Sequence, residues 1–230
     1  MNDFIAFSSS DKMVELIKDN YRLLQVLSRF GIPMGFGDKT VGEVCRRNNV
    51  DINTFIAVIN QMIDETRGTN ENESISLPSL LEFLRKSHAY FLEFCLPAIR
   101  RKLLDAIKLN NEDISFLIIK LFDEYVSEIK AHMDEEEKTL FPYVVALCNG
   151  ELEKRSAVVT YSEHHEDVGS KLKELKNIII KYCPDDSKMN HLNAALYDIY
   201  RCEEELTGHC RVEDNLLIPA IKKLENKELF

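Results

Sequence analysis

One eleven-residue pattern occurs twice in this sequence and limits what the chain can fold into more than any other feature. His132–Pro142 reads HMDEEEKTLFP and His209–Pro219 reads HCRVEDNLLIP, so both copies have Glu at +4, Leu at +8 and Pro at +10 from the His. Each copy also has a Glu four residues before the His, Glu128 and Glu205. Because a helix turns once per 3.6 residues, these side chains form a stripe on one helix face. Two stripes of donor side chains suit two helices that share a metal site.

The repeat also has a purely structural interpretation. A single His with a Glu four residues later is commonly a contact on a helix surface. Agreement at four positions beyond the His arises by chance on the order of once in 10⁴ to 10⁵ placements at usual residue frequencies. Duplication of a structural hairpin would give the same repeat, however. Metal binding therefore requires further donor side chains elsewhere in the chain.

The composition indicates an all-helical protein with a substantial core. Hydrophobic residues make up 45% of the 230 residues and charged residues 30%, with only 8 Gly and 6 Pro. The net charge of −10 argues against a nucleic acid or an anionic membrane surface as partner. The N-terminus has no signal-peptide pattern, no apolar run approaches the ~20 residues of a membrane span, and the six Cys are scattered without a C-x-x-C pair. We therefore expect a cytoplasmic protein with reduced thiols.

The residues up to 66 predict a small N-terminal domain of three helices. The first helix has apolar residues at helical spacing over about 11–30 and ends at a glycine-containing break. Asp38 or Thr40 is expected to cap a short second helix, and Asp51 a third. The predicted N-terminal domain therefore covers residues 1–66.

The residues from 78 to 230 predict an up-down-up-down bundle of four long helices joined by short connections. A polar segment over 67–77 is expected to link this bundle to the N-terminal domain. Pro142 and Pro219 lie late in the second and fourth helices, where each is expected to kink or loosen the helix. The helix boundaries expected from caps, prolines and apolar periodicity are 78–109, 112–148, 151–182 and 188–224.

Each predicted bundle helix carries a His, and a rise of ~1.5 Å per residue brings all four to a similar height. They are His88, His132, His165 and His209. In the third helix His164 and His165 are adjacent and point ~100° apart, so only one can face the bundle axis. His165 is the expected one, because apolar and small residues continue its face along the helix, whereas charged residues continue that of His164.

Four imidazoles and two carboxylates form a set of candidate ligands. The set is too large for one tetrahedral zinc and too rich in nitrogen for calcium or magnesium. It suits two closely spaced iron or manganese ions bridged by Glu136 and Glu213. A ferritin-type site is not expected, because no His here has a Glu three residues before it. Glu128 and Glu205 are expected either to orient imidazoles and pass protons or to be ordinary structural carboxylates.

These residues resemble the hemerythrin-like di-iron bundle, whose motif H-x3-E-x3-L-F-P is present here as His132, Glu136 and Leu140–Pro142. The resemblance extends over about residues 12–224 to the repair-of-iron-centres (ScdA-like) iron-sulfur cluster repair family, in which a small N-terminal helical domain precedes such a bundle. It implies two iron ions, carboxylate-bridged and with an oxo bridge when oxidised. The ligands it implies are His88, His132, Glu136, His165, His209 and Glu213.

The resemblance implies a cytosolic di-iron protein of nitrosative or oxidative stress that repairs iron-sulfur centres through labile iron or nitric oxide chemistry. Nitric oxide reduction is a related activity, and damaged iron-sulfur proteins are the partners it implies. The alternative is hemerythrin-like binding or sensing of oxygen or nitric oxide. Hemerythrin has a fifth His ligand, so four His and two Glu favour the first function. A DNA-binding regulator is not expected, because residues 1–66 have 7 Lys and Arg against 9 Asp and Glu.

The sequence departs from the repair family at one place. The best-known members carry a Cys-Cys pair in the N-terminal domain, about where this sequence has Gly35 and Phe36. Cys45 is the only Cys in residues 1–66, and we expect it to be a core residue of a short helix rather than a reactive thiol. The N-terminal domain is therefore expected to dock a partner or cover the bundle rather than carry iron.

Overall fold

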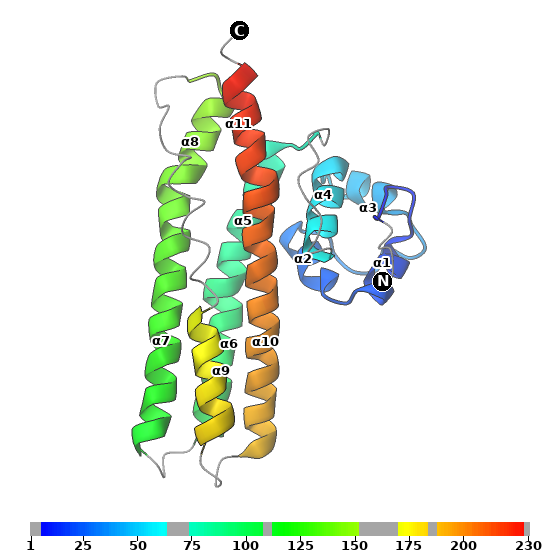
Figure 1. Cartoon of the computed structure of the whole chain (residues 1–230). Helices are drawn as coiled ribbons and strands as arrows, with labels where there is room; N and C mark the ends of the chain where they lie inside the picture. The colour runs from blue at the N-terminus through cyan, green and yellow to red at the C-terminus, as the bar shows by residue number, and fades with distance from the viewer. Residues whose placement is uncertain (1–5, 64–73, 108–111, 152–169, 184–187, 228–230) are drawn as a thin grey trace. The chain divides into compact units, whose positions relative to one another are not determined.

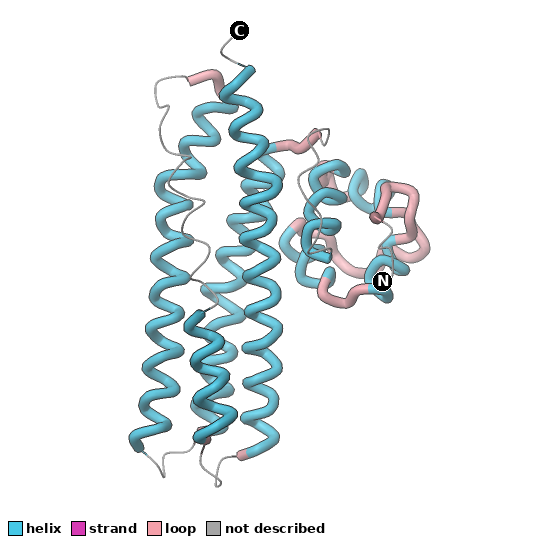
Figure 2. Tube along the Cα trace, in the orientation of Figure 1, coloured by secondary structure: helices cyan, strands magenta, loops and turns pink. Residues whose placement is uncertain are grey.

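A computed structural model of the chain describes residues 6–63, 74–107, 112–151, 170–183 and 188–227 (Figures 1 and 2). Helices form the regular structure of these residues, and an isolated antiparallel bridge joins Lys12 to Thr40. The all-α class predicted from the sequence is confirmed. No helix within the described ranges is both long enough and apolar enough to cross a membrane.

Contacts along the chain divide it into two compact units. Unit 1 comprises residues 1–87, 141–155 and 208–230, and unit 2 comprises residues 88–140 and 156–207. The segments of the two units therefore alternate along the chain. Apolar side chains with little exposed area form the interior of each unit.

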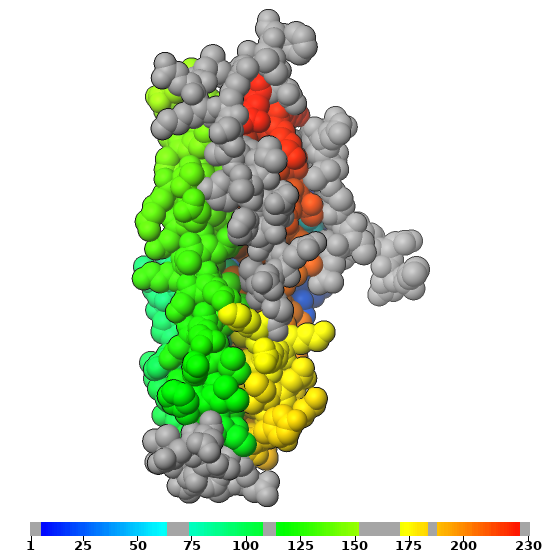
Figure 3. All heavy atoms as spheres, turned by 60° about the vertical axis from the view of Figure 1, so that its left-hand side comes forward, coloured from blue at the N-terminus to red at the C-terminus, as the bar shows by residue number. Residues whose placement is uncertain are grey.

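Unit 2 is a bundle of four helices around one hydrophobic core, as predicted. The segments that build it are η1 (Tyr90–Cys95), α6 (Leu96–Ala106), α7 (Glu112–Glu135), η2 (Glu136–Leu140), α9 (Ser170–Tyr182) and α10 (Met189–Val212), whose residues from Gly208 on belong to unit 1. Phe91, Phe122, Ile179 and Ile199 come from the four different helices and are each at most 1% exposed. Figure 1 shows α6, α7, α9 and α10 side by side, and Figure 3 shows α7 and α9 adjacent on one face. Burial of this shared core holds the four helices together.

The third bundle helix is described in part. The sequence predicts it over 151–182, and α9 covers Ser170–Tyr182 of that range. Residues 152–169, with His164 and His165, lie outside the described residues. The beginning of this helix and the choice between the two His therefore stay predictions.

Unit 1 contains the N-terminal helices together with segments of the long helices. Its segments are α1 (Met13–Asp19), α2 (Leu23–Arg29), α3 (Val41–Arg47), α4 (Ile52–Ile63), α5 (Leu77–Ala89), α8 (Phe141–Cys148), η5 (Glu213–Leu217) and α11 (Ile218–Lys227). Phe30 joins the N-terminal helices to α5, because its ring stacks on Phe83 with centroids 4.8 Å apart and meets Phe55 edge-on at 5.1 Å. The predicted boundary over residues 67–77 stays a prediction.

Helix α4 contacts the last long helix within this unit. The side-chain amide of Asn215 donates a hydrogen bond to Gln61 over 3.2 Å. At Gly208 an added Cβ would lie 2.8 Å from the sulfur of Met62, so the glycine allows α4 to approach α10 closely. The N-terminal helices therefore contact the helix turn that carries Glu213.

The N-terminal helices begin largely where their caps predict. Thr40 and Glu43 form a reciprocal capping box at α3, and the carboxylate of Asp51 accepts the backbone N–H of Thr54 at α4 over 2.8 Å. The helix predicted over 11–30 is instead divided at Asn20, whose backbone is extended. Its side chain accepts the backbone N–H of Arg22 over 3.1 Å, a local hydrogen bond that competes with continuation of the helix.

The long helices contain π-helical turns at matching places. Each of η1, η2 and η5 ends two residues before a proline, namely Pro97, Pro142 and Pro219. The backbone N–H of Leu96 donates to the carbonyl of Phe91, five residues back, and Ile218 does the same to Glu213. The wider turn accommodates a residue that lacks an N–H and would crowd the carbonyl four residues before it. The predicted loosening near Pro142 and Pro219 is confirmed, and it precedes each proline.

We predict that Phe30→Ala lowers the free energy of unfolding by about 3 kcal/mol, because it empties a buried ring site between Phe55 and Phe83. Denaturant unfolding followed by circular dichroism measures the change. Phe116→Ala is the matched control, since Phe116 is 70% exposed, and its effect should be within about 0.5 kcal/mol. Equal effects of the two substitutions would contradict the assigned packing.

Candidate metal centre

His88 lies near the end of α5 and faces Glu136, the first residue of η2. The Nε2 atom of His88 is 3.3 Å from Oε2 of Glu136, and the two residues are 3% and 1% exposed. The other ring nitrogen, Nδ1, is 3.1 Å from Oε1 of Glu137. Because an ionised carboxylate only accepts, Nδ1–H donates to Glu137 and leaves Nε2 as the basic nitrogen. Glu137 thus fixes the ring with its lone pair toward Glu136.

Glu137 was not predicted from the sequence as part of this site. Its sequence signal was its place in the run Glu135–Glu137, next to the predicted ligand Glu136. Adjacent helical residues point ~100° apart, so Glu136 and Glu137 approach the same imidazole from different sides. Which nitrogen of the His88 ring each glutamate reaches depends on the position of the helix that carries His88. That position is set by tertiary packing and cannot be read from the sequence.

Glu136 also faces a second imidazole. His132 lies one turn before it on α7, with Nε2 3.5 Å from Oε1 of Glu136. The two oxygens of this carboxylate are therefore directed to two different His, Oε2 to His88 and Oε1 to His132. The His132 side chain is 17% exposed, whereas that of Glu136 is 1% exposed.

The second copy of the repeat forms the same local pair. His209 lies in the last turn of α10 and Glu213 begins η5, with Nε2 of His209 3.1 Å from Oε1 of Glu213. Both residues are 1% exposed. In both copies the His and the Glu four residues later thus face each other on one side of the helix, as the spacing predicts.

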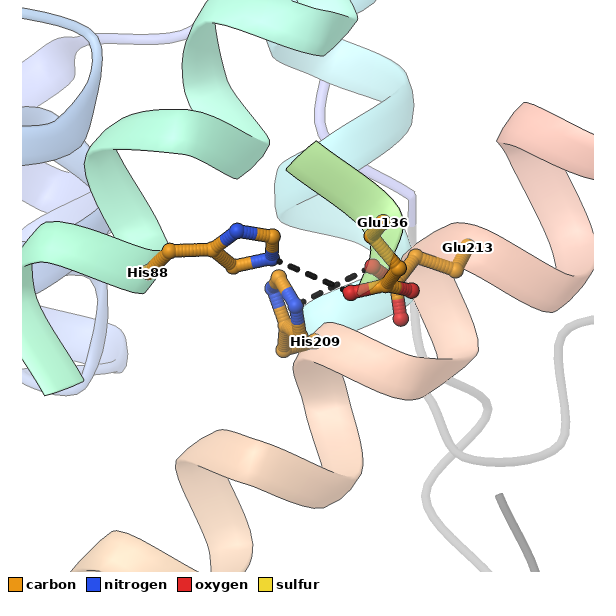
Figure 4. A group of neighbouring side chains, drawn as sticks. All are labelled: His88, Glu136, His209 and Glu213. Atoms are coloured by element: carbon orange, nitrogen blue, oxygen red, sulfur yellow. Dashed lines mark ion pairs between the residues drawn. The ribbon is translucent and has the colours of Figure 1, made fainter. Parts of the chain in front are cut away.

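Four candidate ligands come together in the structure. One donor atom from each of His88, Glu136, His209 and Glu213 lies within 4.8 Å of the other three (Figure 4). Figure 4 shows both imidazoles and both carboxylates directed to a common point. His132 contacts Glu136 beside this group. The sixth predicted ligand, His165, lies outside the described residues.

The donor set fits a bound cation. Two carboxylates this close and this buried repel each other when both are ionised, and burial of each charge costs several kcal/mol. Imidazoles are the ion-pair partners of Glu136 and Glu213 in the site. A divalent cation among the four residues removes the repulsion and accepts lone pairs from neutral imidazoles. The geometry therefore suits metal binding.

The two outlying glutamates of the repeat lie in different surroundings. Glu128 is exposed on α7 and pairs with Lys171 of α9, which is a contact between two bundle helices (Figure 3). Glu205 is 4% exposed, and its Oε1 is 3.6 Å from Nε of Arg201 on the same helix. The expectation that Glu128 and Glu205 orient imidazoles or pass protons stays a prediction.

We predict that Glu137→Ala weakens metal binding about 10- to 100-fold, because the His88 ring loses the acceptor that orients it. Competition with a chelator for Fe²⁺ or Co²⁺ measures the affinity. Glu135→Ala is the matched control, since the exposed Glu135 carboxylate accepts a hydrogen bond from Thr139 instead. An unchanged affinity in Glu137→Ala would exclude this orienting role.

Comparison with known protein families matches residues 79–221 to the hemerythrin HHE cation binding domain. The matched segment covers 143 of the 230 residues and includes the four clustered residues and His132. Domains of this kind bind metal cations, typically iron, and small ligands such as oxygen. The match and the buried His and Glu cluster agree on a cation site in the same helices. This chain belongs to the hemerythrin HHE cation-binding family.

Proposed function

We propose that the chain holds two iron ions bridged by Glu136 and Glu213, with the imidazoles of His88, His132, His165 and His209 as terminal ligands. The observation that carries this proposal is the orientation of Glu136. A carboxylate that bridges two metal ions offers one oxygen to each. The two oxygens of Glu136 face two different imidazoles, at 3.3 Å and 3.5 Å.

The chemistry of the donor set supports iron rather than other biological cations. Imidazole and carboxylate donors without thiolate suit iron, and the family typically binds iron. With two ions, each oxygen of Glu136 can share a metal with the imidazole that it faces. The repeat supplies a second carboxylate, Glu213, at the position equivalent to Glu136. Two ions use all of these donors.

The candidate ligands differ in their access to solvent. His88, Glu136, His209 and Glu213 are each at most 3% exposed, whereas the His132 side chain is 17% exposed. An ion held by His132 is therefore the more accessible of the two. This difference in exposure supports exchange of one iron and approach of a small ligand from the His132 side.

We infer that the protein acts in nitrosative or oxidative stress, through nitric oxide chemistry at this site and supply of iron for repair of damaged iron-sulfur centres. When bound, two ferrous ions supply electrons and open coordination positions to a diatomic ligand. The chain's own residues hold the ions in helices, exclude bulk water at the buried ligands and leave the His132 side open. The resemblance to the repair family supports the same role.

The N-terminal helices contribute to this function by contact rather than by thiol chemistry. Burial raises the pKa of the Cys45 thiol to about 12, and the residue is fully buried. A thiol of this kind is protonated and unreactive at neutral pH. The contacts of Gln61 and Met62 with the last long helix instead support a role in covering the turn that carries Glu213.

Reversible binding or sensing of oxygen or nitric oxide is the second candidate. The low exposure of His88 and His209 favours it, because a water-poor site protects a bound diatomic ligand from side reactions. The two candidates differ in what happens to iron and to nitric oxide. A binding protein retains its iron and takes up ligand in proportion to its sites, whereas a repair protein transfers iron or converts ligand repeatedly.

We predict two irons in the wild-type chain and about one iron in His132→Ala, because only one ion loses a ligand. His165→Ala should reduce the iron content similarly. His164→Ala and His191→Ala are the controls, since the first is the neighbour not expected to face the axis and the second is exposed on α10. Iron analysis with an optical spectrum measures the content. Loss of iron in His164→Ala but not in His165→Ala would reverse that assignment.

We predict that the iron-loaded full-length protein, supplied with an excess of an external electron donor, reduces more nitric oxide than its iron content and restores activity to an enzyme with a damaged iron-sulfur cluster. Nitrous oxide formation and the recovered activity of that enzyme are the measurements. His132→Ala should lose most of both activities, because it removes the exchangeable ion, and His191→Ala should retain them. Stoichiometric nitric oxide uptake with no recovery of the damaged enzyme would favour the binding function instead.

A further inference from the structure

A buried amide of the N-terminal helices, Gln61, contacts the turn that carries Glu213. Gln61 lies on α4, is 1% exposed, and accepts a hydrogen bond from the side-chain amide of Asn215 over 3.2 Å. Asn215 is the third residue of η5, the π turn that Glu213 begins. A buried amide costs stability unless it is hydrogen-bonded. The hydrogen bond from Asn215 therefore compensates the burial of Gln61 and ties α4 to the π turn.

A second contact between α4 and the same long helix lies at Met62. Gly208 directly precedes His209, and an added Cβ at Gly208 would lie 2.8 Å from the sulfur of Met62, so the missing side chain leaves room for the thioether. Gly208 and Asn215 are seven residues apart, and two helical turns place them on one face. Helix α4 thus holds this segment on both sides of His209 and Glu213.

Contacts at these two points fix how the segment is rotated about its axis. Adjacent helical residues point ~100° apart, so His209 lies on the face next to that of Gly208. A rotation of about 10° moves an atom that lies about 6 Å from the helix axis by about 1 Å. Ligand geometry must be held to within about 0.5 Å. Contacts two turns apart oppose such a rotation, and they therefore help to set the direction in which the ligands point.

Helix α4 is a firm support because other contacts anchor it. The side-chain amide of Asn60 donates to the carbonyl of Phe7 over 3.2 Å and accepts the backbone N–H of Phe7 over 2.9 Å. The hydroxyl of Thr54 accepts the backbone N–H of Ser76 over 2.9 Å. Both Asn60 and Thr54 are buried. The position of Gln61 is therefore set by contacts that do not involve the last long helix.

The first copy of the repeat has a different arrangement at the equivalent place. Lys138 is the third residue of η2, as Asn215 is of η5. The Lys138 side chain is 71% exposed, and its Nζ is 3.2 Å from Oδ2 of Asp134 on the preceding helical turn. This residue thus bonds within its own helix, whereas Asn215 bonds to a buried residue of another helix. The two copies share their ligands but differ in how the ligand-bearing turns are supported.

We propose that Gln61 is a positioning residue of the metal centre, which acts through Asn215 to hold Glu213 in the direction that binds metal. By linkage, an α4 contact that favours metal binding is itself favoured by the bound metal. The N-terminal helices therefore regulate how firmly the metal is retained. This inference rests on the proposed ligand roles of His209 and Glu213, and on neither nitric oxide chemistry nor iron-sulfur repair.

The test loads the full-length protein with Co²⁺, whose visible absorption and circular dichroism report ligand geometry, and then follows release of Co²⁺ to EDTA. We expect Gln61→Leu and Asn215→Ala each to change the spectrum and to speed release about 10-fold, because each removes the same hydrogen bond. The double variant should behave like either single variant, since both act through one contact. A wild-type spectrum and release rate in both single variants, or additive effects in the double variant, would overturn the proposal.

Two further variants are the matched controls. Asn60→Ala removes the neighbouring buried amide, which bonds to Phe7, and Lys138→Ala changes the equivalent position of the first copy. Both should keep the wild-type spectrum and release rate. A change in Asn60→Ala equal to that in Gln61→Leu would show a general loosening of α4 and would contradict the specific role of Gln61.

Folding of each variant is established by circular dichroism melting. Asn215→Ala removes the hydrogen bond at a half-buried position, so it carries the test if Gln61→Leu does not fold. Glu213→Gln separates this inference from the proposed function. Unchanged Co²⁺ binding in Glu213→Gln would remove the ligand role of Glu213 itself. Weakened binding in Glu213→Gln, with wild-type behaviour in Asn215→Ala, would remove the positioning role alone.

Discussion

The burial of Glu136 and Glu213 is the constraint on which this structure depends. An ionised carboxylate removed from water costs several kcal/mol unless neighbouring groups compensate it. Each is 1% exposed and lies within 3.5 Å of the imidazole one helical turn before it. The helices must therefore hold the imidazoles and carboxylates together, and a cation completes the balance of charge.

The prolines and π turns set how these carboxylates are presented. Glu136 and Glu213 are each the first residue of a π turn, and Pro142 and Pro219 each lie six residues later. A proline cannot donate to the carbonyl four residues before it, and a π turn shifts the preceding hydrogen bond to the fifth residue back. The turn that begins at each ligand is thereby wider than an α-helical turn. The repeat thus encodes both the donors and the backbone that carries them.

Each of the two units has a buried cysteine, and the surroundings of these two thiols differ. In unit 2 the pKa of the buried Cys95 thiol is lowered, first by hydrogen bonding with Cys202, against the effect of burial. In unit 1, fully buried Cys45 has no such environment and serves only packing. Burial alone therefore does not set the pKa of a thiol, because hydrogen bonding with a neighbouring side chain can offset the cost of desolvation.

The sequence by itself determined the helical class, the bundle, the caps Thr40 and Asp51, and the His and Glu pairs of the repeat. These follow from local rules, since a spacing of four residues fixes a helix face wherever the helix lies. Tertiary structure decided the remainder. Glu137 contacts His88, and Asn215 contacts Gln61, across 49 and 154 residues of the chain. No periodicity specifies such contacts, because they depend on how neighbouring helices are placed in height and rotation by the packing of the whole core.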